Sequence, residues 1–297
     1  MADKHPLHQR HHASAKQSEE AIARLQNNDS YKLAFADNDF LLEDDLRHVR
    51  LQLEYLKPER VLDKHQIDAT VVVFGSARFL SPEQAQYNLD IAQAELDKTP
   101  NDATTKAHWI KAKRDLKNSR YYSESQKFAH LVTEHSQNYP EHRVVVISGG
   151  GPGVMEAANR GATEAGGESI GLNIVLPKEQ YPNPYITPEF CFQFHYFAIR
   201  KMHFLMRARA LVALPGGYGT LDELFETLTL IQTKKIDPVP IVLIGKGFWS
   251  KLINFDLLIE EGLIAPDDVK LFTLVNTAEE AWAHICRCYE LNEGINK

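Results

Sequence analysis

Three glycine-rich segments, each directly after an apolar run, constrain the fold of this chain most strongly. They read GSAR, GGGPG and PGGYGT, at residues 75–78, 149–153 and 215–220. The preceding runs are rich in β-branched residues, which is typical of strands covered on both faces of a parallel sheet; they occupy residues 69–74, 143–148 and 210–214. Because the carboxyl ends of parallel strands lie at one edge of a sheet, we expect the three segments to meet there and to bind a ligand.

The rest of the chain alternates predicted strands and helices with short links. Further strands are predicted at residues 169–174, 190–194 and 240–244, and helices at residues 154–165, 198–208, 220–233, 249–260 and 278–290. This alternation predicts an α/β fold, a Rossmann-like doubly wound parallel sheet spanning residues 69–297. A helical crossover of unusual length, about residues 81–138, is predicted to hold two helices separated at residues 99–102. Ser81 and Pro82 mark the start of the first.

Residues 1–68 are predicted to form a flexible tail and a helical extension. Residues 1–16 are polar and include four histidines, to which we assign no function: His5, His8, His11 and His12. Between residues 39 and 56, leucine and valine recur every three or four positions: Leu42, Leu46, Val49, Leu53 and Leu56. This spacing predicts one helix with a buried stripe, packed on the main domain or on a partner subunit.

The composition argues against several classes of function. With 33 basic and 40 acidic residues the chain carries a net charge of −7, which disfavours general nucleic-acid or anionic-membrane binding but leaves room for a local basic pocket. No apolar run approaches the roughly 20 residues of a bilayer span, and the first residues lack the apolar stretch of a signal peptide, so we expect a cytoplasmic protein. The three cysteines suit neither a disulfide framework nor a zinc site, and we expect reduced thiols at Cys191, Cys286 and Cys288.

The glycine segments do not match two common nucleotide-binding patterns. A Walker A loop needs Lys followed by Ser or Thr after its last glycine, which neither Gly219-Thr220 nor the later GKG segment provides. The GxGxxG pattern fails because Val154 and Asp222 stand where its last glycine would be. The second and third segments nevertheless begin helices, whose free N–H groups favour an anion. Phosphate is therefore the expected ligand.

Glu223 is the first candidate for a chemical role. Thr220 and Glu223 have the spacing of a capping box, in which both side chains only stabilise the start of a helix. The apolar stripe of the same helix, however, leaves Glu223 to one side, over the glycine loop and any ligand bound there. The spacing alone supports the two interpretations equally.

A basic pair on the preceding helix is the second candidate. Arg200 and Lys201 either lie on a solvated helix face or form a local anion site near the third glycine loop. At the start of the same helix, His195 and Tyr196 either line the pocket or form a packed aromatic corner.

These motifs together resemble the LOG (Lonely Guy) family of nucleoside 5′-monophosphate phosphoribohydrolases, which has also carried the label "lysine decarboxylase". The resemblance covers about residues 69–290, and it is carried by FGSAR at 74–78, GGGPGVMEAAN at 149–159, Arg200-Lys201 and PGGYGTLDE at 215–223. It implies hydrolysis of the N-glycosidic bond of AMP-like or cytokinin riboside monophosphates to free base and ribose 5-phosphate. It also implies a homodimer or larger homo-oligomer, with no cofactor and no metal.

The resemblance implies roles for particular residues. Arg200 and Glu223 would be the catalytic pair. Substrate would be bound by Gly75, Ser76, Gly150, Gly151, Met155, Lys201, Gly216, Gly217, Tyr218, Gly219, Thr220 and Thr229. The second glycine segment resembles bacterial nucleotide nucleosidases more than the plant enzymes, and Asp222 stands where the plant motif usually has Glu, so the preferred base stays open.

Two other classes of function remain as alternatives. A carrier or sensor would bind a phosphorylated, nucleotide-like ligand without hydrolysing it, and a panel of nucleoside monophosphates distinguishes it from an enzyme. A decarboxylase that uses pyridoxal phosphate would need a lysine for a Schiff base, and Lys201 is the lysine placed nearest the predicted cleft.

Overall fold

The computed structural model describes residues 17–140, 143–177 and 181–289. The chain divides into two compact units, Met1–Leu53 and Glu54–Lys297. The predicted domain boundary at residue 69 stays a prediction. The four histidines of the predicted tail, His5, His8, His11 and His12, lie outside the described residues.

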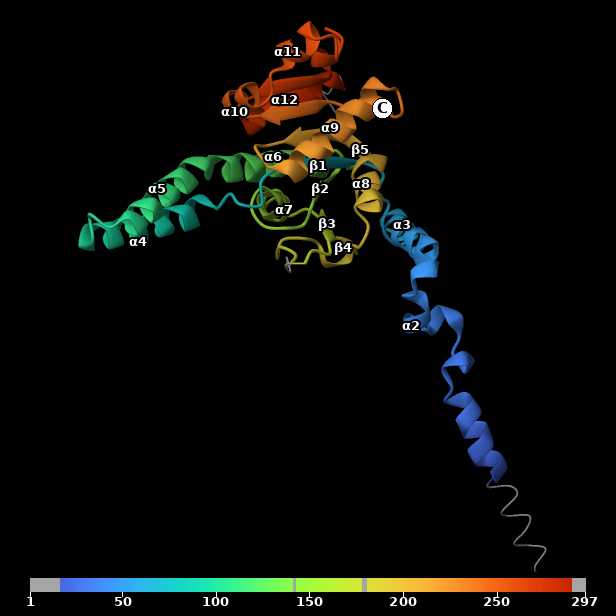
Figure 1. The fold of residues 1–297 in the computed structure, drawn as a ribbon. Coiled ribbons are helices and arrows are strands. Elements are labelled where there is room, and N and C mark those ends of the chain that lie inside the picture. Colours follow the sequence, from blue (N-terminus) through green and yellow to red (C-terminus); the bar gives the residue numbers. More distant parts are fainter. Residues whose placement is uncertain (1–16, 141–142, 178–180, 290–297) are drawn as a thin grey trace, which may run out of the picture. The chain divides into compact units, whose positions relative to one another are not determined.

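The second unit is built on a seven-stranded sheet whose strand pairings are all parallel (Figure 1). Its strands are β1 (Thr70–Phe74), β2 (Val145–Ser148), β3 (Ser169–Ile174), β4 (Cys191–Phe194), β5 (Ala208–Ala213), β6 (Ile241–Ile244) and β7 (Phe272–Val275). The spatial order is β4-β3-β2-β1-β5-β6-β7, so the direction of winding reverses between β1 and β5. Ligands of open α/β sheets bind at such a switch point. The predicted fold class is confirmed, although β7 was not predicted.

Helices cover both faces of this sheet. One face carries α6 (Arg120–Asn138), α7 (Val154–Glu164) and α12 (Ala278–Cys288); the other carries α8 (Phe197–Met206), α9 (Tyr218–Gln232), α10 (Lys246–Leu252) and the end of α3 (Arg47–Lys64). The alternation of side chains along β1 separates the two cores: Val71 and Val73 pack in the first, and Val72 and Phe74 in the second. All of β1 is buried, as its apolar run predicted.

Two predicted helices are divided in the structure. The crossover contains α4 (Pro82–Lys98), α5 (Ala103–Asn118) and α6, because the second predicted helix breaks at Ser119. The predicted start of α4 is confirmed, since the Ser81 hydroxyl accepts a hydrogen bond from the N–H of Gln84 at 3.3 Å. The predicted helix at residues 249–260 is likewise two helices, α10 and α11 (Phe255–Glu260), with Asn254 capping the second.

The helix predicted at residues 39–56 is also broken. A short helix α2 (Asn38–Leu41) is followed by a 3-10 turn (Asp44–Leu46), after which α3 begins. The guanidinium of Arg50 stabilises the break by donating to the carbonyls of Leu41 and Glu43, at 2.7 and 2.6 Å. Within the single chain three members of the apolar stripe are 68%, 52% and 46% exposed: Leu42, Leu53 and Leu56. Packing of the stripe on a partner subunit stays a prediction.

Two further findings concern the chain as a whole. None of the helices within the described residues combines the length and apolar character that crossing a membrane requires. The three cysteines are free thiols; Cys191 and Cys288 are exposed, and Cys286 is partly buried.

Candidate functional site

The three glycine loops meet at the carboxyl ends of β1, β2 and β5, and the main chain of Ser76 joins them. Its N–H donates to the carbonyl of Pro215 at 3.1 Å, and its carbonyl accepts from the N–H of Val154 at 3.0 Å. Gly153 has φ +72° and lies so close that a Cβ there would overlap the Ser76 carbonyl. Only glycine fits this junction. The loops therefore share one edge of the sheet, as the strand pattern predicted.

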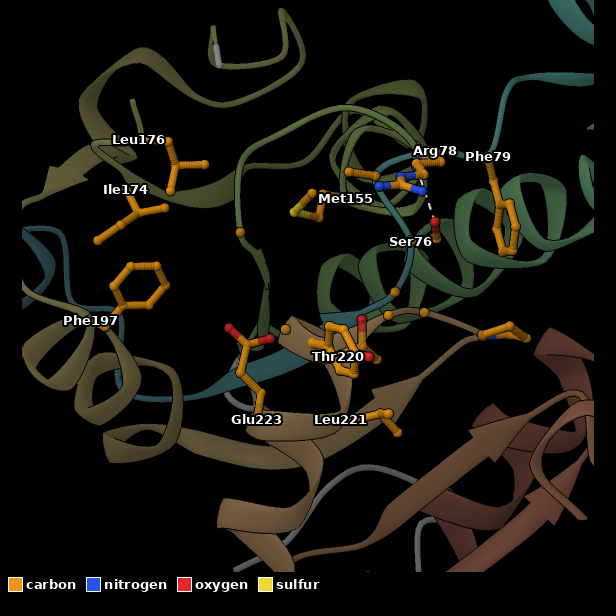
Figure 2. Close-up of a pocket in the computed structure, with 18 of the residues that line it drawn as sticks. Ser76, Arg78, Phe79, Met155, Ile174, Leu176, Phe197, Thr220, Leu221 and Glu223 are labelled. Atoms are coloured by element: carbon orange, nitrogen blue, oxygen red, sulfur yellow. Dashed lines mark hydrogen bonds between the residues drawn. The ribbon is translucent and has the colours of Figure 1, made fainter. Parts of the chain in front are cut away.

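A cleft of about 710 Å³ opens over the loops, at the switch point between β1 and β5 (Figure 2). This volume lies within the range of small-ligand sites, roughly 300–1,000 Å³. Both predicted catalytic residues, Arg200 and Glu223, line the cleft. So do most of the predicted substrate-binding residues: Gly75, Ser76, Met155, Gly216, Gly217, Tyr218, Gly219 and Thr220.

Two predicted binding glycines lie outside this lining. Gly150 has φ +72° and faces Asn173, whose side-chain nitrogen would be 2.6 Å from an added Cβ. The carbonyls of Gly150 and Gly151 accept hydrogen bonds from the main chain and side chain of Asn183, at 2.9 and 3.1 Å. These glycines hold the second loop against Asn183 instead of facing the cleft.

Lys201 and Thr229 also lie outside the cleft lining. Lys201 follows Arg200 by one residue, so its side chain leaves the helix about 100° around the axis from that of Arg200. Its ammonium group lies 3.0 Å from a carboxylate oxygen of Asp222 and 3.1 Å from one of Glu226. Thr229 is far along α9, where its hydroxyl donates to the carbonyl of Phe225 at 2.7 Å.

The capping-box interpretation of α9 is wrong. The helix begins at Tyr218 with Gly217 at its N-cap, and no side chain caps it. Thr220 and Glu223 therefore lie within the first two turns, and the Thr220 side chain packs so closely on Gly216 that a Cβ at Gly216 would overlap it. Glu223 is left to face the cleft, and Figure 2 shows its carboxylate pointing into it.

Arg200 is held beside Glu223 from several sides. Its Nη1 lies 3.4 Å from Oε1 of Glu223, and the two side chains are only 9% and 14% exposed. Its Nε donates to the carbonyl of Leu172 at 2.8 Å, and its guanidinium lies 5.0 Å from the ring centre of Phe204. Gly149 leaves space for it, because a Cβ there would lie 2.6 Å from Nη2.

Burial sets the protonation of this pair. Loss of solvent raises the pKa of Glu223 to about 7, even though the charge of Arg200 acts to lower it; the nearby Asp222 carboxylate raises it further. Burial also lowers the pKa of Arg200, an effect that Glu223 opposes. Near neutral pH Glu223 is thus about half ionised, which suits a group that exchanges protons with a substrate.

Several lining residues were not predicted. Among them are apolar side chains: a first wall of Ile174, Leu176 and Phe197, and further Phe79, Phe248 and Leu252. In Figure 2 the first wall lies to the left of Glu223, and Phe79 lies to the right together with Arg78. The position of Arg78 in the FGSAR motif could have indicated that it lines the cleft. The apolar residues carry no such signal, because in a sequence they resemble core residues.

His195 and Tyr196 form the aromatic corner that was one of the two alternatives for them. Neither is among the residues that line the cleft. Their rings meet edge to face with centres 4.7 Å apart, and their main-chain N–H groups both donate to the carboxylate of Glu54.

The side chains near the cleft can be compared with those that a metal site or a pyridoxal phosphate enzyme needs. Among the described residues, no three His, Cys, Asp or Glu side chains are grouped so that they could hold a metal ion. In the part of the chain that the structure describes, no lysine lines the cleft, and the ammonium group of Lys201 is paired elsewhere. A decarboxylase that uses pyridoxal phosphate therefore loses its candidate lysine.

Comparisons with known proteins agree with the sequence motifs. A family model described as "Possible lysine decarboxylase" matches residues 155–285. A cytokinin riboside 5′-monophosphate phosphoribohydrolase of Arabidopsis thaliana is 32% identical over 140 residues, which cover 46% of this chain and 63% of that protein. A probable cytokinin riboside 5′-monophosphate phosphoribohydrolase of Oryza sativa subsp. japonica is 31% identical over 140 residues, covering 46% and 55%. The chain thus spans about three fifths of the length of these relatives.

Among solved structures, the molybdenum cofactor carrier protein from Chlamydomonas reinhardtii is 17% identical, with a TM-score of 0.42, over 74% of this chain and 97% of that one. This likeness is too weak to indicate a function.

Proposed function

We propose that the chain hydrolyses the N-glycosidic bond of nucleoside 5′-monophosphates; the match to the family model and the likeness to relatives named cytokinin riboside 5′-monophosphate phosphoribohydrolases support this proposal. The products are the free base and ribose 5-phosphate. The observation that carries this proposal is the buried Glu223–Arg200 pair, which faces a cleft whose floor is a glycine loop at a helix N-terminus. No cofactor enters the proposed reaction.

The 5′-phosphate binds at the third glycine loop. The start of α9 has no side-chain cap, so its first N–H groups are available to an anion, and the helix dipole favours negative charge there. Arg78, an exposed cation that lines the cleft, adds positive charge from the first loop. Phosphate binding positions the sugar over Glu223, so that a group that does not react contributes to catalysis.

Glu223 and Arg200 act on the sugar and the base. Cleavage of the bond develops positive charge on C1′ of the ribose, and an ionised Glu223 stabilises this charge. The same carboxylate takes a proton from the attacking water, whose oxygen forms the new bond to C1′. The departing base leaves with the electron pair of the broken bond and gains a proton from solvent, and Glu223 releases the proton it took from the water, so that the water supplies the net proton. Arg200 orients the substrate and offsets the negative charge that develops on the base.

The base lies against the apolar wall of the cleft. Ile174, Leu176 and Phe197 are on one side of Glu223, and a flat heterocycle buries its faces well against such side chains. The substrates we propose are AMP and cytokinin riboside monophosphates, the latter because the relatives are named for them. A homodimer and a cytoplasmic location stay predictions.

The test is to incubate the protein with a panel of nucleoside monophosphates and to measure free base and ribose 5-phosphate. Glu223→Gln and Arg200→Ala should each lower the rate at least ~10²-fold, which is typical for the loss of one acid–base or electrostatic group. Lys270→Ala is the control, since its exposed ammonium group pairs with Asp267 and the residue does not line the cleft, and its rate should stay near that of the wild type. Near-normal release by both catalytic variants would refute the assignment. Tight binding of a nucleotide without turnover would instead identify a carrier.

A further inference from the structure

Helix α8, which carries Arg200, is capped by a residue from a distant part of the chain. Tyr196 is its N-cap residue, but the side chain of Tyr196 makes no capping hydrogen bond. The carboxylate of Glu54, on α3, takes that place: its two oxygens accept hydrogen bonds from the N–H groups of His195 and Tyr196, at 2.8 and 3.1 Å. A carboxylate at a helix N-terminus also interacts favourably with the helix dipole.

This cap is linked to Arg200 through one main-chain hydrogen bond. The N–H of Arg200 donates to the carbonyl of Tyr196 at 3.2 Å, so the residue whose N–H is held by Glu54 also receives the first helical hydrogen bond from Arg200. The Arg200 side chain then reaches back to the carbonyl of Leu172 and to Glu223. A shift of the first turn of α8 would therefore move the guanidinium relative to the Glu223 carboxylate.

We propose that Glu54 is a positioning residue, which fixes the first turn of α8 and thereby holds Arg200 in place beside Glu223. The helix that precedes the sheet in the sequence would thus complete the site without contacting the substrate. The inference rests on the proposed function for its kinetic test only, because the position of α8 can be measured without any substrate.

The chain offers a matched control on the same helix. Asp63 is also an α3 carboxylate that binds α8, but it accepts from the guanidinium of Arg207 at 2.7 Å, at the far end of that helix. Its replacement removes one contact between α3 and α8 and leaves the cap at the first turn in place. Comparing Glu54→Ala with Asp63→Ala therefore separates a general loosening of α3 from the loss of the cap.

Hydrogen exchange tests the cap directly. In the full-length protein, Glu54→Ala should speed exchange of the amides of residues 195–200 about fivefold, the effect expected from loss of one helix cap. Glu54→Gln should fall between this variant and the wild type, since its carboxamide oxygen still accepts hydrogen bonds but has no charge. Asp63→Ala should leave the exchange of residues 195–200 unchanged. Equal exchange in Glu54→Ala and the wild type would overturn the proposal.

Kinetics tests the consequence for the reaction. Glu54→Ala should lower kcat for nucleotide cleavage roughly tenfold and change KM less than about twofold, because the phosphate loop on α9 is not touched. As Arg200 moves away, its lowering effect on the pKa of Glu223 weakens, so the acidic limb of the kcat profile should move to higher pH. Glu54→Gln should restore part of kcat, and Asp63→Ala should leave the pH profile unchanged.

The possible failures are distinct. Faster exchange at residues 195–200 with an unchanged kcat and pH profile would overturn the positioning role and leave Glu54 as a stabilising cap. If the wild-type protein cleaves no nucleotide, the proposed function fails, and the exchange experiment alone decides whether Glu54 holds α8.

Discussion

Replacing Glu223 by glutamine should make the protein more stable at alkaline pH, although it should lower the proposed activity. The Glu223 side chain is 14% exposed and its pKa is about 7, whereas an unfolded glutamate has a pKa near 4.5. The folded state therefore disfavours the ionised form. Well below pH 4.5 the carboxyl is protonated in both states, so it does not lower the free energy of unfolding. As the pH rises from 4.5 through 7, ionisation stabilises the unfolded state more than the folded state, so the free energy of unfolding falls.

The size of this effect follows from the pKa difference. The two values differ by about 2.5 units, and at 1.36 kcal/mol per unit the ionised carboxylate costs the fold about 3 kcal/mol above pH 7. The attraction of Arg200 is already included, because it contributes to the folded pKa. Glutamine has the shape of the protonated acid and no charge at any pH. Glu223→Gln should thus have a free energy of unfolding close to that of the wild type at pH 4.5, and about 3 kcal/mol higher at pH 8.5.

Urea unfolding at these two pH values, followed by tryptophan fluorescence, measures the difference. Glu226→Gln is the matched control, because it removes a carboxylate from the same helix at a partly exposed position that pairs with Lys201. The control should show no comparable gain at pH 8.5. A Glu223→Gln protein that is no more stable than the wild type at pH 8.5 would mean that Glu223 is not the buried, proton-exchanging carboxyl described here.

Three further predictions concern the loops. Gly149→Ala should lower kcat at least ~10-fold, because its Cβ would lie 2.6 Å from Nη2 of Arg200 and displace the guanidinium. Urea unfolding should show a cost of only about 1 kcal/mol, since the flexible side chains nearby can move aside. Gly153→Ala should cost at least ~2 kcal/mol in the same assay, because φ is +72° and the Cβ would meet the rigid Ser76 carbonyl; an equally stable variant would contradict this packing. Arg78→Ala should raise KM for AMP roughly tenfold with kcat little changed, and an unchanged KM in steady-state assays would remove Arg78 from the phosphate site.

Much of the fold could be predicted because its strands are continuous apolar runs. The six predicted strands all exist, and the glycines after β1, β2 and β5 correctly indicated a shared edge. β7 (Phe272–Val275) was missed because three of its four residues are only partly buried, so it lacks the pattern of a strand covered on both faces. The helix breaks at residue 119 and at residues 42–46 were missed because the apolar period continues across them.

The candidate site could be predicted only in part, for reasons that particular residues show. Glu223 was ambiguous because its spacing from Thr220 imitates a cap, and the true N-cap at Gly217 is visible only in the structure. Lys201 was misplaced because sequence adjacency to Arg200 hides the turn of about 100° between them. Glu54 lies 142 residues from Tyr196, and no local pattern reports a contact across such a separation.

The junction at Ser76 has a consequence for how the cleft can change over evolutionary time. The three loops are joined through main-chain hydrogen bonds at Ser76, whereas the surrounding lining includes many apolar side chains that take no part in these bonds. Mutations at Ile174, Leu176 or Phe248 would therefore change the shape of the cleft and leave the contacts between the loops in place. Under the proposed function, such an arrangement would let relatives of this chain diverge in the base they accept while Arg200 and Glu223 stay in place.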